Sequence, residues 1–130
     1  VNGTRFIYKM EKGAMRKLNN FGNLFFQFII SIVINKKLTD SLCGTKVFSK
    51  SSVENLLKWQ RTLIAKDPFG DFDFLFSAAY SGAQILEYPV HYKARSYGNT
   101  QISRFSDGVK LLLYFLNSFI VFNSSKNVDK

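Results

Sequence analysis

The sequence predicts an α/β fold with a small sheet. Short extended segments alternate with longer helical patterns in the order β-α-β-α-α-β-α, and such alternation is typical of α/β proteins. The chain has 130 residues, of which 46% are hydrophobic and 21% charged, so it is long enough for one globular domain with an apolar core. The extended segments are few and short, which fits half of a larger sheet better than a complete domain.

The first half of the chain is expected to hold a strand, a long helix and a second strand. Residues 2–8 predict a strand end and a loop, with Gly3 available for a tight turn. A helical pattern covers about 13–34, and from Leu24 onward it is apolar nearly all round, which indicates deep burial or contact with lipid. Its run of about ten apolar residues is too short to cross a bilayer, which takes about 20. Residues 46–49 are a candidate short strand.

Two helices separated by a loop are predicted next. Ser51 or Ser52 is expected to cap the first helix, which runs to about Ile64. The loop 65–70 contains a proline and a glycine, both of which interrupt regular structure. The second helix is expected over 71–81.

The last part of the chain predicts a strand and a final helix. Gly82 is expected to end the preceding helix. Residues 83–94 have the pattern of a strand, in which Pro89 indicates a sheet edge or a bulge. A strongly apolar helix is expected over 107–122, followed by a polar tail at 123–130. That helix would be about 24 Å long, short of the roughly 30 Å of a bilayer core, so it is either a core helix or an interfacial helix among lipid headgroups.

The chain is strongly basic, with 18 Lys and Arg residues against 9 Asp and Glu and a formal net charge of +9. Such a charge favours phosphate-bearing partners, which include nucleic acid, anionic lipid and phosphorylated substrates. The basic residues are scattered, so charge alone does not separate these classes. The 14 Phe and 6 Tyr residues indicate a large apolar core, a membrane-facing surface or an interface.

The single cysteine and the single histidine exclude several kinds of site. Cys43 rules out an internal disulfide and a cysteine-based zinc site, and it fits a reducing compartment. His91 cannot form a histidine metal cluster by itself, and it argues against a Ser-His-Asp triad. The small residues at 43–45 would let a ligand approach the backbone, and Lys46 beside them could meet an anion, but the segment is too short for a P-loop.

Two carboxylates, Asp71 and Asp73, lie among phenylalanines in the segment FGDFDF at 69–74. As a helix cap, Asp71 would accept hydrogen bonds from first-turn amides, and Asp73 would lie where the helix dipole favours negative charge. As a catalytic group, a carboxylate at the head of the helix would act as a general base beside a cleft, and the phenylalanines would form an apolar surface that excludes water. Both interpretations are open.

Three arginines are candidates for binding an anion. Arg95 and Arg104 bracket a loop that contains glycine, threonine and serine, and paired guanidinium groups near hydroxyls and backbone amides can hold a phosphate. Arg5, just after Gly3, is the third candidate. The alternative for each is a solvated surface arginine.

Three motifs follow one another along the chain: LCGTKVF at 42–48, FGDFDF at 69–74, and ILEYPVHYKARSYGNTQISRF at 85–105. Their order resembles the C-terminal half of family 2 glycosyltransferases. The nearest branch contains the dolichyl-phosphate mannosyltransferases and the bacterial polyprenyl-phosphate sugar transferases. The resemblance covers residues 1–122, the acceptor-side part of a glycosyltransferase domain, and leaves 123–130 as the polar tail.

The resemblance implies a GT-A fold, a Rossmann-like α/β sandwich that binds a nucleotide sugar and a divalent metal such as Mg²⁺ or Mn²⁺. The nucleotide-binding half, with most of the metal ligands, would lie upstream of Val1, so the chain is expected to be a fragment that is inactive alone. The intact inverting enzyme would move a hexose from a nucleotide diphosphate sugar to an acceptor, such as a polyprenyl phosphate. It would act at the cytoplasmic face of a membrane as a peripheral or tethered protein.

The resemblance also implies roles for individual residues. Asp71 matches the aspartate that in many relatives deprotonates the attacking hydroxyl, and Asp73 matches a second acidic position. Those relatives carry an acidic residue where this chain has Gly70. A phosphate acceptor is already ionised, and with such an acceptor Asp71 would position groups instead.

The basic and amide side chains are carried over in the same way. Arg5 and Arg95 match arginines near the acceptor phosphate. Gln101 and Arg104 match a Gln-x-x-Arg-Trp motif, with Phe105 in place of the tryptophan, and would lie near the acceptor and the diphosphate.

Two other classes of function stay open. One is a non-catalytic basic module that binds anionic membrane lipid, in which the acidic pair is only a cap. The other is a nucleic-acid binder, which is suggested only by charge and aromatic content and is the least favoured. The expected partners are therefore a nucleotide sugar, an acceptor and a membrane surface, with no nucleic acid.

Overall fold

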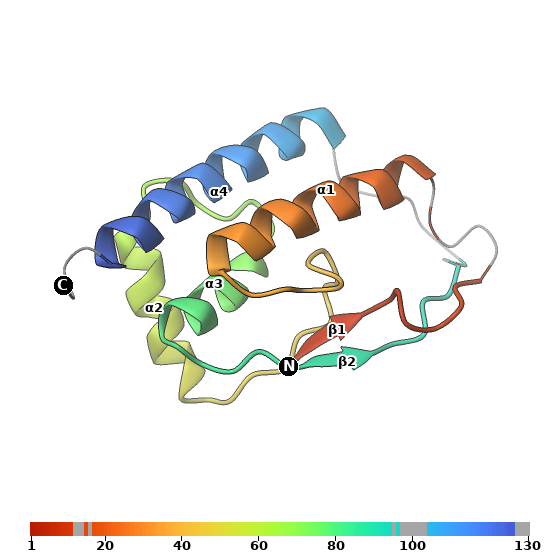
Figure 1. The fold of residues 1–130 in the computed structure, drawn as a ribbon, viewed down its shortest axis with the longest axis horizontal. Helices are drawn as coiled ribbons and strands as arrows, with labels where there is room; N and C mark the ends of the chain where they lie inside the picture. Colours follow the sequence, from red (N-terminus) through yellow and green to blue (C-terminus); the bar gives the residue numbers. More distant parts are fainter. Residues whose placement is uncertain (12–14, 16, 95, 97–103, 127–130) are drawn as a thin grey trace.

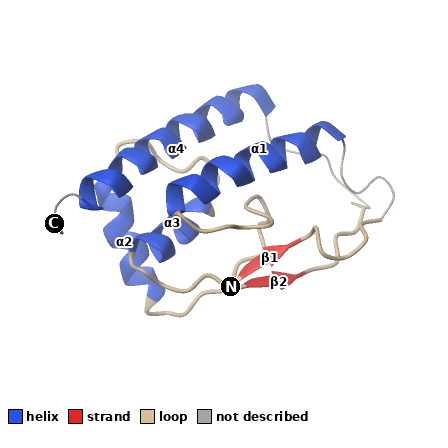
Figure 2. Ribbon diagram, viewed as in Figure 1, coloured by secondary structure: helices blue, strands red, loops and turns tan. Residues whose placement is uncertain are grey.

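The computed structural model of the protein describes residues 1–11, 15, 17–94, 96 and 104–126. Its elements run in the order β1 (Asn2–Thr4), α1 (Lys17–Ile34), α2 (Ser52–Thr62), α3 (Phe72–Tyr80), β2 (Glu87–Pro89) and α4 (Arg104–Lys126). Figure 1 shows α1 and α4 running side by side, with the two strands on the side of α1 away from α4. Helices α2 and α3 pack against each other and against α4, where the ring of Trp59 lies 5.3 Å from that of Phe122. The architecture is α/β-like, as predicted, with helices predominating over a small sheet (Figure 2).

The sheet is built around β1. Strands β1 and β2 pair in parallel, with Gly3 opposite Tyr88 in the register. A third segment lies along the other side of β1, where Lys46 forms an antiparallel bridge with Asn2. The N–H of Gly3 also donates to the carbonyl of Thr45 at 2.8 Å. Strand β1 is therefore hydrogen-bonded on both sides.

Two strand predictions are too long. The strand expected at 46–49 is reduced to the bridge, because the chain turns there toward α2, with the N–H of Ser52 donating to the carbonyl of Ser49 at 3.0 Å. The strand expected over 83–94 is reduced to β2. It ends at Pro89, which has no N–H for a ladder, and β2 pairs only with β1 among the described residues, so the predicted edge is confirmed.

The two long helices differ from their predicted bounds. Helix α1 begins at Lys17, and of the residues 13–16 that were expected to be helical before it, 13, 14 and 16 lie outside the described part of the chain. Helix α4 begins three residues before the expected start and continues to Lys126, so residues 123–126 are helix and not tail. They contain neither glycine nor proline, so nothing in them stops the helix.

The expected helix caps have opposite outcomes. Ser51 precedes α2 but makes no capping hydrogen bond, because its backbone is already helical (φ −62°, ψ −25°) and not extended. The predicted end at Gly82 is confirmed. Its φ of +72° favours glycine, and the N–H groups of Gly82 and Ala83 donate to the carbonyls of Ala79 and Ala78. These two bonds form a Schellman motif.

The core lies between the helices and is rich in aromatic rings. The second half of α1 buries one face in it and exposes the other, so neither full burial nor full exposure describes that helix. The buried members of the core are Ile30, Val33, Ile34, Leu38, Trp59, Phe72, Leu75, Phe76, Leu111, Tyr114, Phe115 and Phe122. Six of these twelve side chains are aromatic, but they include only 4 of the 14 Phe and 1 of the 6 Tyr residues, so the buried core explains only part of the aromatic excess.

Gly3 is required by close packing and not by a turn. A Cβ at this position would lie 3.0 Å from Cys43 Sγ and 3.0 Å from both the Cβ and the carbonyl oxygen of Thr45. We expect Gly3→Ala to lower the free energy of unfolding by about 1–3 kcal/mol, because the packed backbone of the neighbouring segment must shift.

The matched control is Gly108→Ala in α4, where a Cβ would meet nothing within 4 Å. This change should leave the stability unchanged or raise it by up to about 1 kcal/mol. Urea unfolding of both variants at neutral pH measures the difference. Equal stabilities would contradict the packing argument.

Candidate functional site at the head of α3

Asp67, and not Asp71, caps the first turn of α3. Asp67 Oδ2 accepts hydrogen bonds from the backbone N–H groups of Phe72 at 2.7 Å and Asp73 at 3.0 Å, and its Oδ1 accepts one from Phe69 at 2.9 Å. The backbone of Asp71 is helical (φ −99°, ψ −19°), and its side chain makes no capping bond. A capping side chain needs an extended backbone to reach these amides. The predicted cap at Asp71 is therefore wrong.

Asp71 forms an ion pair with Lys46 instead. Lys46 Nζ lies 3.0 Å from Asp71 Oδ2, donates to the carbonyl of Cys43 at 2.6 Å and lies 5.9 Å from the centre of the Phe72 ring. The side chain of Lys46 is 6% exposed and that of Asp71 is 28% exposed. The lysine is thus fixed below the surface, and it holds a carboxylate that solvent and a ligand can reach. The anion expected beside Lys46 is, in this structure, Asp71 itself.

Asp73 lies inside the protein and has a different set of partners. Its Oδ1 accepts hydrogen bonds from the hydroxyl of Tyr114 at 2.6 Å and from Trp59 Nε1 at 3.2 Å, and its Oδ2 accepts one from Gln60 Nε2 at 2.8 Å. The residue is only 5% exposed. The two carboxylates of FGDFDF therefore lie in different environments, and Asp71 is the one that solvent can reach.

Ionisation at the head of α3 is governed by burial. Burial raises the pKa of Asp67, and the nearby charges of Asp73 and Asp71 raise it further. The hydrogen bonds from backbone N–H groups lower this pKa, but the net shift is upward. Burial likewise raises the pKa of Tyr114, and the hydrogen bond to Asp73 adds to the increase. Tyr114 therefore stays protonated and acts as a donor.

Arg5 lies at the carboxyl end of β1 and is paired with Asp40. Arg5 Nε donates to Asp40 Oδ2 at 2.6 Å, and one terminal nitrogen donates to Asp40 Oδ1 at 2.8 Å and to Asn23 Oδ1 at 3.3 Å. Burial lowers the pKa of Arg5, but the bond to Asp40 and its charge raise it more, and the net shift is upward. The guanidinium is also 5.1 Å from the centre of the Tyr92 ring. Its charge is balanced inside the protein.

The other predicted site residues fall at or beyond the limits of the described chain. Arg95 and Gln101 lie outside the described residues. Arg104 is the first residue of α4, and its side chain is not among those described. The structure therefore brings Asp71 together with Lys46 and Asp73 together with α2 and α4, and it places Arg5 in a separate cluster with Asp40.

The described residues do not fit a divalent metal. Nowhere in this part of the chain do three His, Cys, Asp or Glu side chains gather as a metal site. The expectation of Mg²⁺ or Mn²⁺ concerned ligands mainly outside the chain, and it stays a prediction.

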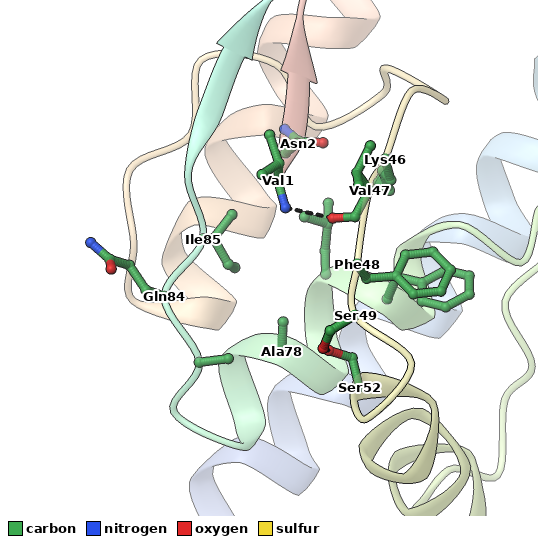
Figure 3. Close-up of a pocket in the computed structure, with 13 residues that line it drawn as sticks. Val1, Asn2, Lys46, Val47, Phe48, Ser49, Ser52, Ala78, Gln84 and Ile85 are labelled. Atoms are coloured by element: carbon green, nitrogen blue, oxygen red, sulfur yellow. Dashed lines mark hydrogen bonds between the residues drawn. The ribbon is translucent and has the colours of Figure 1, made fainter.

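A hollow of about 540 Å³ lies along one side of α3, between the amino ends of the strands and the turn into α2 (Figure 3). Its lining residues are Val1, Asn2, Lys46, Val47, Phe48, Ser49, Ser52, Phe74, Leu75, Ala78, Ala83, Gln84 and Ile85. Among the described residues, no carboxylate, histidine or arginine lines it. We therefore do not regard this hollow as a catalytic cleft.

Several residues of the site were not identified from the sequence. Asp67 could have been found, because Asp before Pro-x-Gly favours a turn in which the carboxylate bonds to nearby amides. Asp40 and the partners of Asp73 carry no local signal. They come from segments far apart in the chain, and only folding brings them together.

Half of the large exposed apolar side chains among the described residues lie on the two long helices. Helix α1 exposes a stripe of large apolar side chains at helical spacing, and Phe28 in it is 66% exposed. Helix α4 exposes a similar stripe, in which Ile120 is 61% exposed. The stripe of α1 consists of Leu18, Phe21, Leu24, Phe25, Phe28 and Ile32, and that of α4 of Val109, Leu112, Leu113, Leu116, Phe119 and Ile120. Among the described residues, no helix has the length and apolar character to cross a membrane.

Comparison of the chain with protein-family models, with characterised proteins and with solved structures found no match. The resemblance to family 2 glycosyltransferases therefore rests on the sequence motifs alone and stays a prediction.

The cap at Asp67 leads to a paired stability prediction. Asp67→Ala should lower the free energy of unfolding by about 1 kcal/mol, because two first-turn amides lose their acceptor. Asp67→Asn should cost less, since asparagine also caps and brings no charge into the buried position.

The same pair tests the raised pKa. The folded state holds a proton on Asp67 more tightly than the unfolded state does, so its contribution to stability declines as pH rises from about 3.8 toward the raised value. Asp67→Asn should remove this decline. Urea unfolding across that pH range measures it, and parallel pH profiles for both proteins would contradict the assignment.

Proposed function

We propose that the protein is the acceptor-side part of an inverting family 2 glycosyltransferase that works at a membrane surface. One observation carries the proposal: Asp71 lies at the head of α3 as a partly exposed carboxylate, held by Lys46 and free of the capping role that Asp67 fills. A carboxylate that is fixed in direction, reachable from solvent and not needed as a cap fits a group that acts on a substrate.

In the proposed reaction, an oxygen of the acceptor attacks the anomeric carbon of the donor sugar. The new carbon–oxygen bond forms as the bond between that carbon and the diphosphate breaks, and the electron pair of the broken bond leaves with the nucleotide diphosphate. When the acceptor is a hydroxyl, its proton passes to the carboxylate of Asp71. When the acceptor is an ionised phosphate, no proton has to be removed, and Asp71 orients the groups around it.

The parallel pairing of β1 and β2 supports placing them in the larger sheet of a GT-A fold. Parallel sheets are rarely stable with two short strands, and they are normally covered on both faces. Tyr88, on β2, is 67% exposed, so this part of the sheet has an uncovered surface. In the proposal, a nucleotide-binding half outside this chain completes the sheet and binds the donor, together with the divalent metal.

The proposed acceptor site relies less on Arg5 than on the loop residues. Because Asp40 balances the charge of Arg5, that guanidinium has little charge left to attract an acceptor phosphate. Its geometry supports a role in fixing the segment around Asp40 against the end of β1. Arg95, Gln101 and Arg104 stay predicted contacts of the acceptor and diphosphate.

Asp71→Asn in the full-length enzyme tests the proposed function. With a hydroxyl acceptor, turnover should fall by about 100-fold or more, because the amide cannot take the proton. With a polyprenyl phosphate the loss should be smaller, since only positioning is removed. The assay follows the release of nucleotide diphosphate from UDP-glucose and from GDP-mannose.

Glu54→Gln is the matched control, because Glu54 is an exposed first-turn carboxylate of α2 and should be dispensable. If Asp71→Asn folds normally and its turnover is unchanged with both acceptors, the catalytic role of Asp71 is contradicted.

A second candidate function, a basic module that binds anionic lipid, is favoured by the apolar stripes of α1 and α4. A helix that lies in a membrane interface exposes one apolar face in this way. The chain also carries a formal net charge of +9, which favours binding to anionic lipid. This candidate needs no active carboxylate. It is compatible with the enzyme, whose lipid acceptor would lie at such a surface.

The membrane surface is tested with vesicles of phosphatidylcholine and phosphatidylglycerol in a ratio of about 3:1, in which the anionic lipid supplies a negative surface potential. The protein should sediment with them, and Phe28→Glu should weaken binding by about tenfold or more, because one large apolar side chain no longer inserts.

Ile64→Glu is the control, since Ile64 is 92% exposed but lies beyond α2 and outside both stripes. Equal effects of the two changes, or no sedimentation of the unmodified protein, would remove the membrane surface from the proposal.

A further inference from the structure

The buried carboxylate of Asp73 joins three helices. Trp59 and Gln60 reach it from α2 and Tyr114 reaches it from α4, while Asp73 itself belongs to the first turn of α3. Trp59 Nε1 also lies 3.3 Å from the hydroxyl of Tyr114, so the donors are in contact with one another. This four-residue group is called the Asp73 cluster below.

Stability alone does not explain the Asp73 cluster. Moving a carboxylate from water into the protein interior costs roughly several kcal/mol of free energy. Hydrogen bonds from its partners at best offset that cost. Well-packed apolar side chains of similar volume often give equal or greater stability at such positions. A buried charge with three donors does, however, define one arrangement of the helices, because any shift leaves a charged group without its partners.

The position of the Asp73 cluster points to what this arrangement serves. Asp73 is two residues after Asp71 in the same turn, and its backbone N–H is held by Asp67 at 3.0 Å. The turn that carries Asp71 is therefore fixed through its backbone by a loop and through its side chain by α2 and α4. Tyr114 makes the shortest of the bonds to the Asp73 carboxylate, at 2.6 Å.

We infer that Tyr114 is a positioning residue for the proposed reaction. It acts through Asp73 to hold the first turn of α3, and thereby sets the direction of the Asp71 carboxylate toward its substrate. The inference rests on the proposed function of Asp71. It also gives α4 a second role. The helix that buries Tyr114 exposes its apolar stripe on other faces, so contact at that stripe can reach the head of α3 through the hydrogen bond from Tyr114 to Asp73.

The test variant is Tyr114→Phe, which removes only the hydroxyl and keeps the ring in its edge-to-face contact with Phe76. The matched control is Ser118→Ala on the same helix. Ser118 is also fully buried, but its hydroxyl donates to the carbonyl of Tyr114 within α4 at 2.8 Å and does not reach α3. Both variants lose one buried hydroxyl, and only one of them loses the link to Asp73.

The first measurement is hydrogen exchange of the backbone amides at 72–74 in the full-length enzyme. Tyr114→Phe should speed this exchange by about tenfold, as expected for the loss of one hydrogen bond to a charged group, and Ser118→Ala should not. Equal exchange in Tyr114→Phe and the unmodified enzyme would overturn the inference, whatever the activity.

The second measurement is a double-mutant cycle on turnover of UDP-glucose or GDP-mannose with a polyprenyl phosphate. Tyr114→Phe should lower kcat by about tenfold with KM for the donor unchanged, and it should have no further effect in the Asp71→Asn enzyme. Additive losses would overturn the inference, because a general loss of structure acts in both backgrounds. Full turnover of Asp71→Asn, with faster exchange in Tyr114→Phe, would overturn the proposed function and leave the link between the helices established.

Discussion

The hydrogen bonds to the carboxylate of Asp73 fix how the helices around it pack. Tyr114, Trp59 and Gln60 supply the donors, and each bond crosses from one helix to another. Apolar packing between α2, α3 and α4 tolerates small sliding movements, but a buried charge does not. The head of α3, the candidate site, is thereby placed relative to the long helix α4, whose outer surface is apolar.

Asp71 and Asp73 are separated by one residue but have opposite surroundings, and Asp67 makes the helix cap that was expected of Asp71. Asp73 points into the core, whereas Asp71 points to Lys46 and solvent. Asp67 comes from the preceding loop and satisfies the first-turn amides. Because the amides already have an acceptor, the carboxylate of Asp71 is available for the ion pair with Lys46 and stays partly exposed to solvent. The three side chains are chemically identical, so their roles differ because the backbone places each carboxylate differently.

The sequence predicted the features that depend on local physics. Helical periodicity located all four helices of the described chain, and the helix end signalled by Gly82 is where we expected it, whereas the strand expected over 83–94 is reduced to Glu87–Pro89. The strand at 46–49 and the serine cap of α2 were wrong, because local preference favours them but the path of the chain does not. The Asp73 cluster could not be predicted, since 41 residues separate Asp73 from its partner Tyr114 and neither carries a signal of the other.

Trp59 makes the junction of the helices visible by spectroscopy. It is the only tryptophan in the chain, it is fully buried, and its ring lies 5.3 Å from that of Phe122 in α4 and 5.8 Å from that of Phe76 in α3. Its indole N–H is shared between a carboxylate and a phenol, both of which alter the emission of a nearby indole. The intrinsic fluorescence of the protein is therefore a single-site signal from the point where α2, α3 and α4 meet. A movement of α4 that is too small to change the helix content would still change the emission wavelength or the fluorescence lifetime of Trp59.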